Sequence, residues 1–504
     1  MVFLILPPLV GPTILFLVVY IAFKHVTRPK PIPDVPSLPA ISFFGNGLDI
    51  AKHYKKTETI HDAFIDVLRK TGGMVLGQVL ISAFTPILLT ADPDQIDRIL
   101  ISQDWDRGIR STGVFKPLIP HALLALSIDE EYKAHKRAFA FGVSSSFLKE
   151  TSKRFIEEDH ALIDTWSSQT GEWFDPEPEL TYRQARAISA VVFGEPSNLI
   201  DKDLKTLFKT LSAGPLAPIK RMIEKVRPTN REAYKRIIQY VQSRTTISRK
   251  KFSEGGDVAL IENMIDGIVQ KEAESGVAVL SPDGLRDELV SMILAGDETS
   301  VTTQLWVLKF LSNHPAIQYK LRQHLLERVE PLDVRSPTVD DLTPEHTPFL
   351  EAVIQEVLRV GNPVAIIGRE AMRDTTLVGP SGGKSFPAPK GTKILLLLGP
   401  EGTEGRVGKD TMEFKPERWL NEKGEYDSSA VWQASFAKGP RACYGSKQAL
   451  ISIRMFIVYI SLTFFLEKPP PKLQSTRRVE RVTLRPSDLV IKLKPWEKLE
   501  QGEN

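Results

Sequence analysis

The feature that most constrains this chain is one long helical pattern near its centre. The pattern begins at Ser281, a residue type that caps helices, with Pro282 at the first helical position. It continues without a break to Asn313-His314-Pro315, where the proline ends it. A helix of about 31 residues is roughly 47 Å long. We therefore expect one helix that crosses the whole domain.

The rest of the body is also mostly helical in pattern. Helical periodicity dominates from about Asp94 to Arg359, and no Gly/Ser-rich linker divides the chain. Strand-like runs occur only toward the two ends, at Met74–Leu80, Ala83–Thr90, Lys393–Leu398 and Leu489–Leu493. With 42% hydrophobic residues, the chain can bury a large core. The sequence predicts a single mainly α domain with a small β region.

The N-terminus predicts a membrane anchor. Residues 2–23 contain no charged side chain, and as a helix they would measure roughly 33 Å, enough to cross a bilayer core. The run is followed by the basic residues Lys24, His25, Arg28 and Lys30 and by a proline-rich stretch. We expect a transmembrane helix at 1–24, a hinge at 25–40 and a cytosolic body at 41–504. A cleaved signal peptide is the main alternative, but the run lacks a basic n-region and a small-x-small cleavage site.

Charge and cysteine content exclude several classes of protein. The formal charge of +3 is spread along the chain, which does not indicate a nucleic-acid-binding protein. Cys443 is the one cysteine, so an intrachain disulfide and a multi-cysteine zinc site are both excluded.

The middle of the long helix breaks a local rule. It reads Ala295-Gly296-Asp297-Glu298-Thr299, with a glycine that costs about 1 kcal/mol relative to alanine and two acids between apolar turns. Such a violation in a well-formed helix indicates a functional position. Alternatively, Gly296 relieves a close helix crossing and Thr299 bonds back to the Ala295 carbonyl.

The lone cysteine lies in a loop whose neighbours suit a ligand. Residues 436–445 read Phe-Ala-Lys-Gly-Pro-Arg-Ala-Cys-Tyr-Gly, directly before a helical pattern. A thiolate gains from the N-terminus of a helix, and Gly439 and Gly445 allow a flat ligand to approach the backbone. Arg441 adds a fixed positive charge able to pair with an acidic ligand group. This pattern favours a thiolate metal ligand over the alternative, a packed free thiol.

The pattern Phe436-x-x-Gly439-x-Arg441-x-Cys443-x-Gly445 resembles the haem-binding loop of cytochrome P450 enzymes. Three further motifs are similar to those of the family: the 295–299 pentad, Glu356-x-x-Arg359, and the Pro-Glu-Arg-Trp segment at 416–419. By itself, the pair Glu356 and Arg359 would indicate only a solvated surface bridge. The four motifs occur in the family's order, with roughly 60, 60 and 25 residues between them.

The resemblance implies haem (iron protoporphyrin IX) held by a cysteine thiolate. Cys443 would be the axial ligand of the haem iron, which favours O–O cleavage. Arg441 and Arg369 would meet the haem propionates, Phe436 would lie near the thiolate, and Gly439 would shape the loop.

The resemblance also implies roles for the other motifs. Glu298 and Thr299 would be catalytic and deliver protons to oxygen beside Gly296. A buried network would hold the cysteine loop in place, consisting of Glu356, Arg359 and Arg418.

The sequence departs from the family in two places. In the helix expected around 129–137, Tyr132 stands where a tryptophan is usual, and Lys136 replaces the arginine that binds a propionate. Lys136 can still make one hydrogen bond but lacks the bidentate fork. Residues 399–412 lack the family's His-Arg-Asp-Pro-like run. This segment is either a divergent surface loop or a gene-model error.

The resemblance implies an NADPH-dependent monooxygenase of a lipophilic small molecule, similar to fungal enzymes of specialised metabolism. A membrane-bound NADPH–cytochrome P450 reductase would supply electrons at the endoplasmic reticulum membrane. The apolar stretches 107–126, 211–218 and 364–367 would determine the substrate; 211–218 could equally dock on the membrane. Alternatives are a haem-thiolate isomerase, dehydratase or cyclase, and a non-catalytic haem or membrane scaffold.

Overall fold

The computed structural model of the chain describes residues 17–19, 31–40, 45–80, 86–107, 115–116, 118–197, 203, 206, 223–224, 227–254, 261–329, 337–379 and 385–497. Four predictions fall partly or wholly outside these residues: most of the anchor, residues 25–30 of the hinge, residues 108–114 and 117 of the stretch 107–126, and all of the stretch 211–218. Among the described residues, no helix combines the length and the hydropathy needed to cross a bilayer.

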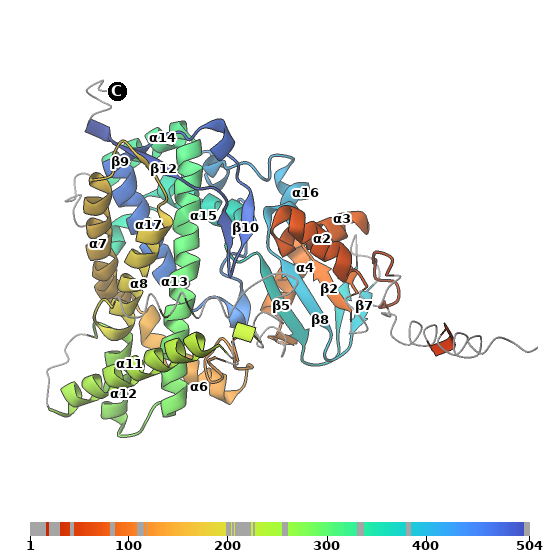
Figure 1. Cartoon of the computed structure of the whole chain (residues 1–504), viewed down its shortest axis with the longest axis horizontal. Coiled ribbons are helices and arrows are strands. Elements are labelled where there is room, and N and C mark those ends of the chain that lie inside the picture. The colour runs from red at the N-terminus through yellow and green to blue at the C-terminus, as the bar shows by residue number, and fades with distance from the viewer. Residues whose placement is uncertain are drawn as a thin grey trace, which may run out of the picture.

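The described chain is mainly helical, as predicted, with small sheets (Figure 1). The helices are α2 (Gly47–Thr57), α3 (Ile60–Lys70), α4 (Pro93–Ile101), α6 (Glu130–Ala138), α7 (Ser145–Ser167), α8 (Glu177–Phe193), α11 (Pro228–Ser253), α12 (Met264–Ser275), α13 (Pro282–Asn313), α14 (Pro315–Val329), α15 (Pro348–Gly361), α16 (Glu404–Val407) and α17 (Ser446–Thr463). In Figure 1 the long helices α7, α8, α13 and α17 form one side of the molecule, and the largest sheet with α2, α3 and α4 forms the other.

The predicted central helix is α13, and the structure places its ends where the sequence signals them. The Ser281 side chain accepts the N–H of Gly284 at 3.0 Å, and the helix ends one residue before His314. It packs against α8, α11, α15, α17 and the strand β11 (Leu484–Pro486). Because these partners surround it, most of its side chains are buried.

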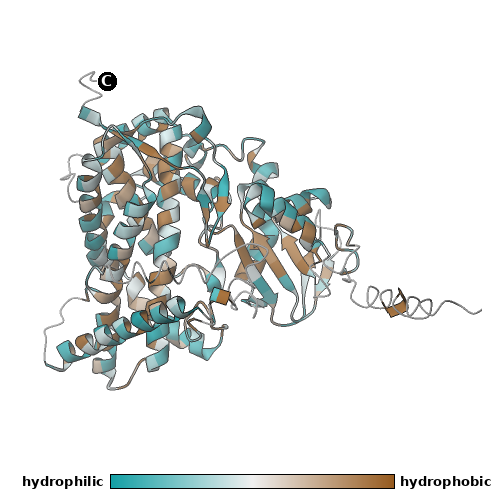
Figure 2. Cartoon of the chain, viewed as in Figure 1, coloured by the Kyte–Doolittle hydropathy of each residue, from teal (hydrophilic) through white to brown (hydrophobic). Residues whose placement is uncertain are grey.

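The largest sheet has five strands in the order β1-β2-β8-β5-β3. Their bounds are β1 Gly77–Val79, β2 Ile87–Thr90, β3 Trp105–Asp106, β5 Ile366–Ala371 and β8 Lys393–Leu397. β2 and β8 run parallel, and the other neighbours are antiparallel. The strands are largely hydrophobic (Figure 2). Strand β3 places Asp106 opposite Glu370, next to Arg369. This pairing brings together two segments that lie far apart in the sequence.

The remaining strands form three small sheets. These are the hairpin of β10 (Arg478–Glu480) with β11, the pair of β6 (Thr375–Val378) with β7 (Ser385–Ala388), and the order β4-β12-β9 from Trp173–Phe174, Ile491–Pro495 and Phe464–Leu466. The predicted strand at Leu489–Leu493 is therefore shifted toward the C-terminus by two residues.

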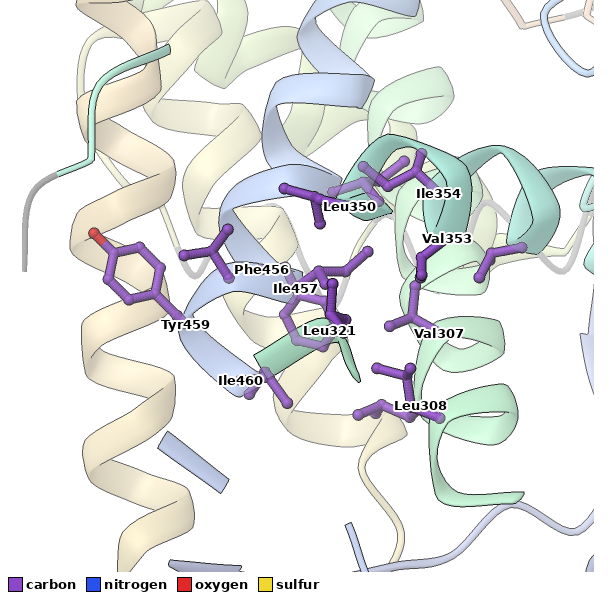
Figure 3. Packing of buried hydrophobic residues seen from close by; sticks show 14 of the residues in the cluster. Val307, Leu308, Leu321, Leu350, Val353, Ile354, Phe456, Ile457, Tyr459 and Ile460 are labelled. Carbon is purple, nitrogen blue, oxygen red and sulfur yellow. The ribbon is translucent and has the colours of Figure 1, made fainter. Parts of the chain in front are cut away.

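The largest hydrophobic cluster joins the C-terminal half of α13 to α14, α15 and α17 (Figure 3). Val307 and Leu308 of α13 lie close to Leu321 of α14 and Val353 of α15, while Phe456 belongs to α17. All of these side chains are at most 1% exposed. Removing large buried side chains of this kind typically costs about 2–5 kcal/mol. The cluster fixes α17, which follows the cysteine loop, relative to α13.

Candidate active site

The cysteine loop has a tightly determined backbone. Ala437 and Gly439 adopt positive φ angles of 54° and 67°. A Cβ at Gly439 would lie 2.3 Å from the Leu100 carbonyl oxygen, so a glycine is required there. The N–H of Cys443 donates to the Phe436 carbonyl at 2.8 Å, and this bond closes the loop.

Cys443 combines burial with an accessible surface. The residue is exposed, yet the surrounding protein raises the pKa of its thiol by desolvation, against the opposing effects of a Gly445 backbone hydrogen bond and the Arg107 charge. That combination is expected of a side chain that lines an internal space. Metal coordination or a nearby cation is needed to favour its thiolate.

Three guanidinium groups gather beside the cysteine loop. Arg441 Nε lies 2.7 Å from Asp106 Oδ1, and both side chains are almost fully buried. Burial, and next the neighbouring guanidinium charges, lower the pKa values of Arg107 and Arg369 to about 10. Within the described part of the chain, Asp106 is the carboxylate that pairs with this cluster, and it pairs with Arg441. The cluster therefore carries two more positive than negative charges.

This charge excess fits a dianionic ligand such as the two propionates of haem. Desolvated like charges repel, and an anionic ligand relieves the repulsion. Among the described residues, Arg369 donates to the backbone carbonyl of Gly368 at 3.0 Å, and Arg107 donates Nη1–H to the Leu124 carbonyl at 2.8 Å. Each guanidinium thus has further N–H groups to offer. Together with an accessible thiol, the donor set fits a haem group.

The segment around Leu123 links the cysteine loop to α13. The N–H of Leu123 donates to Glu288 Oε1 at 2.7 Å, and its carbonyl accepts from Arg441 Nη1 at 3.0 Å. His135 Nδ1 lies 2.7 Å from the same Glu288 oxygen. Burial raises the pKa of Glu288, and the His135 hydrogen bond opposes it. Leu123 therefore connects the cysteine loop to Glu288 of α13, and Glu288 in turn contacts His135 of α6.

The two residues that depart from the family pattern, Tyr132 and Lys136, both lie on α6. Tyr132 donates its hydroxyl to the Pro440 carbonyl at 2.9 Å, and the Arg441 guanidinium lies 4.1 Å from the centroid of its ring. Lys136 is exposed, with Nζ 5.8 Å from the same centroid. The sequence analysis missed Arg107, which here supplies the third guanidinium. In the sequence, Arg107 directly follows Trp105-Asp106, and this position could have drawn attention to it. Its place near Arg369, however, depends on the pairing of β3 with β5.

Three residues of the pentad form an accessible strip on the otherwise mostly buried helix α13. Ala295 is exposed, and Gly296 and Thr299 are half-buried. The two local interactions considered from the sequence are also present. Thr299 Oγ1 donates to the Ala295 carbonyl at 2.7 Å, and a Cβ at Gly296 would lie 2.8 Å from Ile188 Cδ1 of α8. The close approach of α8 to α13 explains Gly296, while the accessible strip leaves space beside Thr299.

Glu298 is held away from solvent by a partner from the β10–β11 hairpin. Its Oε2 accepts from Arg485 Nη2 at 2.5 Å, and its Oε1 accepts from Arg485 Nε at 3.2 Å. The Thr483 hydroxyl donates to the same Oε1 at 2.9 Å. The pentad's acid is thus engaged by three hydrogen bonds.

Glu356, Arg359 and Arg418 form a single buried ion-pair network. Glu356 accepts two bonds from Arg359, both at 2.8 Å, and one from Arg418 Nε at 2.8 Å. The Arg418 bond is to Glu356 Oε1, and the indole N–H of Trp419 donates to Glu356 Oε2 at 2.9 Å. Glu356 is fully buried, so this pair is not the solvated bridge that the spacing alone would indicate.

Part of the divergent segment 399–412 packs into the fold, while residues 404–406 and 408–409 are exposed. The Thr411 carbonyl accepts from Arg359 Nη1 at 2.6 Å, and the hydroxyls of Thr403 and Thr411 lie 2.9 Å apart. Among the described residues, His61, Asp62 and Glu401 are close enough to hold a metal ion. Arg478 already bonds to both of those carboxylates, and its guanidinium supplies the positive charge that a metal would bring.

A comparison with known proteins shows which protein family the chain matches. A family model described as "Cytochrome P450" matches residues 35–493. The chain is 24% identical to "Cytochrome P450 monooxygenase TRI13" of Fusarium sporotrichioides, over 95% of this chain and 98% of that protein. It is 23% identical to "Cytochrome P450 monooxygenase GME11363" of Pestalotiopsis microspora, over 94% and 96%, and 24% identical to human "Cytochrome P450 2A7", over 65% and 66%.

Proposed function

Because the chain belongs to the cytochrome P450 family, we propose that it is a haem-thiolate monooxygenase acting on a lipophilic small molecule. The reaction is RH + O2 + NADPH + H⁺ → ROH + H2O + NADP⁺, with both electrons taken from NADPH. The observation that carries the proposal is the excess of two buried guanidinium charges beside an accessible thiol. When bound, haem supplies the activation of molecular oxygen.

The haem-binding residues follow from the cluster. Cys443 would ligate the iron, and Arg441, Arg369 and Arg107 would bind the two propionates. The bond from Cys443 N–H to the Phe436 carbonyl supports a role for Phe436 in fixing the thiolate. Gly439 lets the loop pass close to Leu100. Lys136 was expected at a propionate, but its exposure favours Arg107 for that position.

Glu298 and Thr299 would supply protons at the accessible strip of α13. The Thr299 hydroxyl is half-buried at this strip and donates to Ala295, so its oxygen retains acceptor capacity toward a proton donor. Glu298 is the adjacent carboxylate, connected through Thr483 to a second hydroxyl, that of Thr302. Glu298, Thr483 and Thr302 thus form a buried hydrogen-bonded chain.

The Glu356 network would act on haem only indirectly. It ties α15 to the segment that precedes the cysteine loop, through Arg418 and the backbone N–H of Lys415. We assign Glu356, Arg359 and Arg418 to support of that loop, because their polar groups are directed at one another.

A lipophilic substrate is favoured by apolar side chains that stay exposed in the described part of the chain. Val482, in the turn of the hairpin whose Thr483 and Arg485 bond to Glu298, is 37% exposed, and Val364, two residues before β5, is 40% exposed. We propose a fungal secondary-metabolite intermediate as the substrate, since two relatives matched over nearly their full length are monooxygenases of fungi.

We further propose the membrane location and the electron donor that the sequence implies. The apolar run of residues 2–23 would anchor the chain in the endoplasmic reticulum membrane, and residues 41–504 would face the cytosol. An NADPH–cytochrome P450 reductase would supply the electrons.

The test is a reconstitution with a P450 reductase and NADPH. The ferrous protein should give the carbon monoxide absorption band of thiolate-ligated haem, and product should form only when oxygen and reductase are both present. Turnover that continues without either one would instead support an isomerase, dehydratase or cyclase. A colourless protein would contradict the proposal.

A further inference from the structure

We propose that Arg485 is a positioning residue for Glu298, and that its side chain controls the proton supply at the accessible strip of α13. This inference rests on the proposed function. It concerns a residue of the β10–β11 hairpin that lies 187 positions from Glu298 in the sequence.

The contact between the two side chains is specific. Arg485 approaches Glu298 with two nitrogens, Nη2 on one carboxylate oxygen at 2.5 Å and Nε on the other at 3.2 Å. The two side chains are 7% and 9% exposed, so solvent screens their attraction little. A fork of this kind fixes both the position and the orientation of a carboxylate.

The hairpin adds a hydroxyl to the same carboxylate. Thr483 Oγ1 lies 2.9 Å from Glu298 Oε1 and 2.6 Å from Thr302 Oγ1 on α13. Glu298 cannot turn toward the strip at Thr299 without giving up these bonds. The pairing with Arg485 therefore sets how readily the carboxylate moves.

A second carboxylate makes such movement possible. Arg485 Nη1 also bonds to Glu177 at the start of α8. If Glu298 turned away, the guanidinium would keep one negative partner and would not be left as an unpaired buried charge. Glu177 thus lowers the cost of releasing Glu298.

The chain offers a matched control on the same hairpin. Arg481 Nη1 bonds to Glu177 at 2.9 Å, but its side chain is 59% exposed. Among the described residues it pairs with Glu177 and not with Glu298. Replacing Arg481 removes one arginine from the hairpin and leaves the Arg485–Glu298 contact in place.

The experiment compares Arg485→Gln, Arg485→Lys and Arg481→Gln in the full-length holoenzyme with reductase. The reduced carbon monoxide spectrum is recorded first; if the wild-type chain lacks the thiolate band, the proposed function fails and not this inference alone. With the band present, Arg485→Gln removes the fork that sets how readily Glu298 moves. We therefore expect it to change the peroxide released per NADPH consumed by about fivefold or more, together with the solvent isotope effect on NADPH consumption. Arg485→Lys keeps the charge without the fork and should give an intermediate value, while Arg481→Gln should match the wild type.

A second readout does not depend on turnover. The melting temperatures of Glu298→Gln, Arg485→Gln and the double variant are compared with that of the wild type in a double-mutant cycle. Each single substitution should lower the melting midpoint by roughly 3 °C. The double variant should melt no lower than the less stable single variant, because both substitutions remove the same contact. Additive shifts would overturn the inference, as would wild-type peroxide release and isotope effect in Arg485→Gln. If Arg485→Gln does not bind haem, Arg485→Lys decides: intermediate peroxide release supports the inference, and wild-type release overturns it.

Discussion

Arg441 and Asp106 form an ion pair at 2.7 Å, and this pair neutralises only one of three guanidinium groups gathered beside the cysteine loop. The other two, on Arg107 and Arg369, lie in the same desolvated region. Folding therefore leaves a charge imbalance that an anionic ligand would correct.

The first prediction concerns Arg107. Arg107→Gln removes one of the excess charges and should speed the loss of haem by roughly 10–150-fold, the range for one hydrogen bond to a charged group. Haem transfer to an apo-globin measures the rate. Lys136→Gln is the control and should change the rate little. A larger effect from Lys136→Gln would return the propionate contact to Lys136.

The second prediction concerns Thr299. Thr299→Ala removes a half-buried hydroxyl whose hydrogen bond is to the Ala295 carbonyl. We expect more peroxide per NADPH with haem still bound, and a stability change within about 1 kcal/mol. Unchanged peroxide release would assign Thr299 a purely structural role.

The third prediction concerns the buried network. Glu356→Gln leaves two guanidinium groups without their carboxylate and should destabilise the fold by about 3–5 kcal/mol. The midpoint of denaturant unfolding, followed with the Soret absorption, is the measurement. Glu417→Gln is the control, taken from the segment 416–419 that supplies Arg418 and Trp419 to the network. Glu417 pairs with Lys320 at 2.7 Å on the exposed surface, so its loss should cost less than about 1 kcal/mol. Equal losses in the two variants would contradict the buried role.

The fourth prediction concerns pH. Burial, and next the nearby charge of Asp62, raise the pKa of Glu480 to about 7, while the Ile60 N–H bond at 2.6 Å opposes the shift. Because the folded-state pKa lies above the unfolded value, the protonated carboxyl stabilises the fold fully below about pH 4.5. This contribution, up to about 3 kcal/mol, is lost as the pH rises through about 7.

Glu480→Gln should therefore match the wild type near pH 5 and melt at a higher temperature at pH 8. Melting curves across this range test the difference. Curves that stay parallel would show that Glu480 does not titrate in this window.

Elements that depend on local signals were predictable from the sequence. The cap at Ser281, the proline after it and the proline at the far end fix α13, and the structure places both ends within a residue of expectation. The apolar run at Lys393 likewise appears as strand β8. Such signals act within one turn or one strand, so a single sequence contains them.

Contacts between distant segments were not predictable in this way. Glu356 and Arg359 read as a surface pair until Trp419 and Arg418 are packed over them from some sixty positions away. Arg107 joins the guanidinium cluster only because β3 pairs with β5. Glu298 meets Arg485 through a hairpin near the C-terminus. Each of these contacts depends on tertiary structure rather than on local pattern.

The most direct test of the central claim is the absorption spectrum of the reduced protein with carbon monoxide, for the wild-type chain and for Cys443→Ser. Serine keeps the size and polarity of the side chain but lacks the thiolate sulfur. The account predicts the thiolate-type band in the wild type and its loss in Cys443→Ser. A variant that keeps the band, or a wild-type protein that binds no haem, would contradict it.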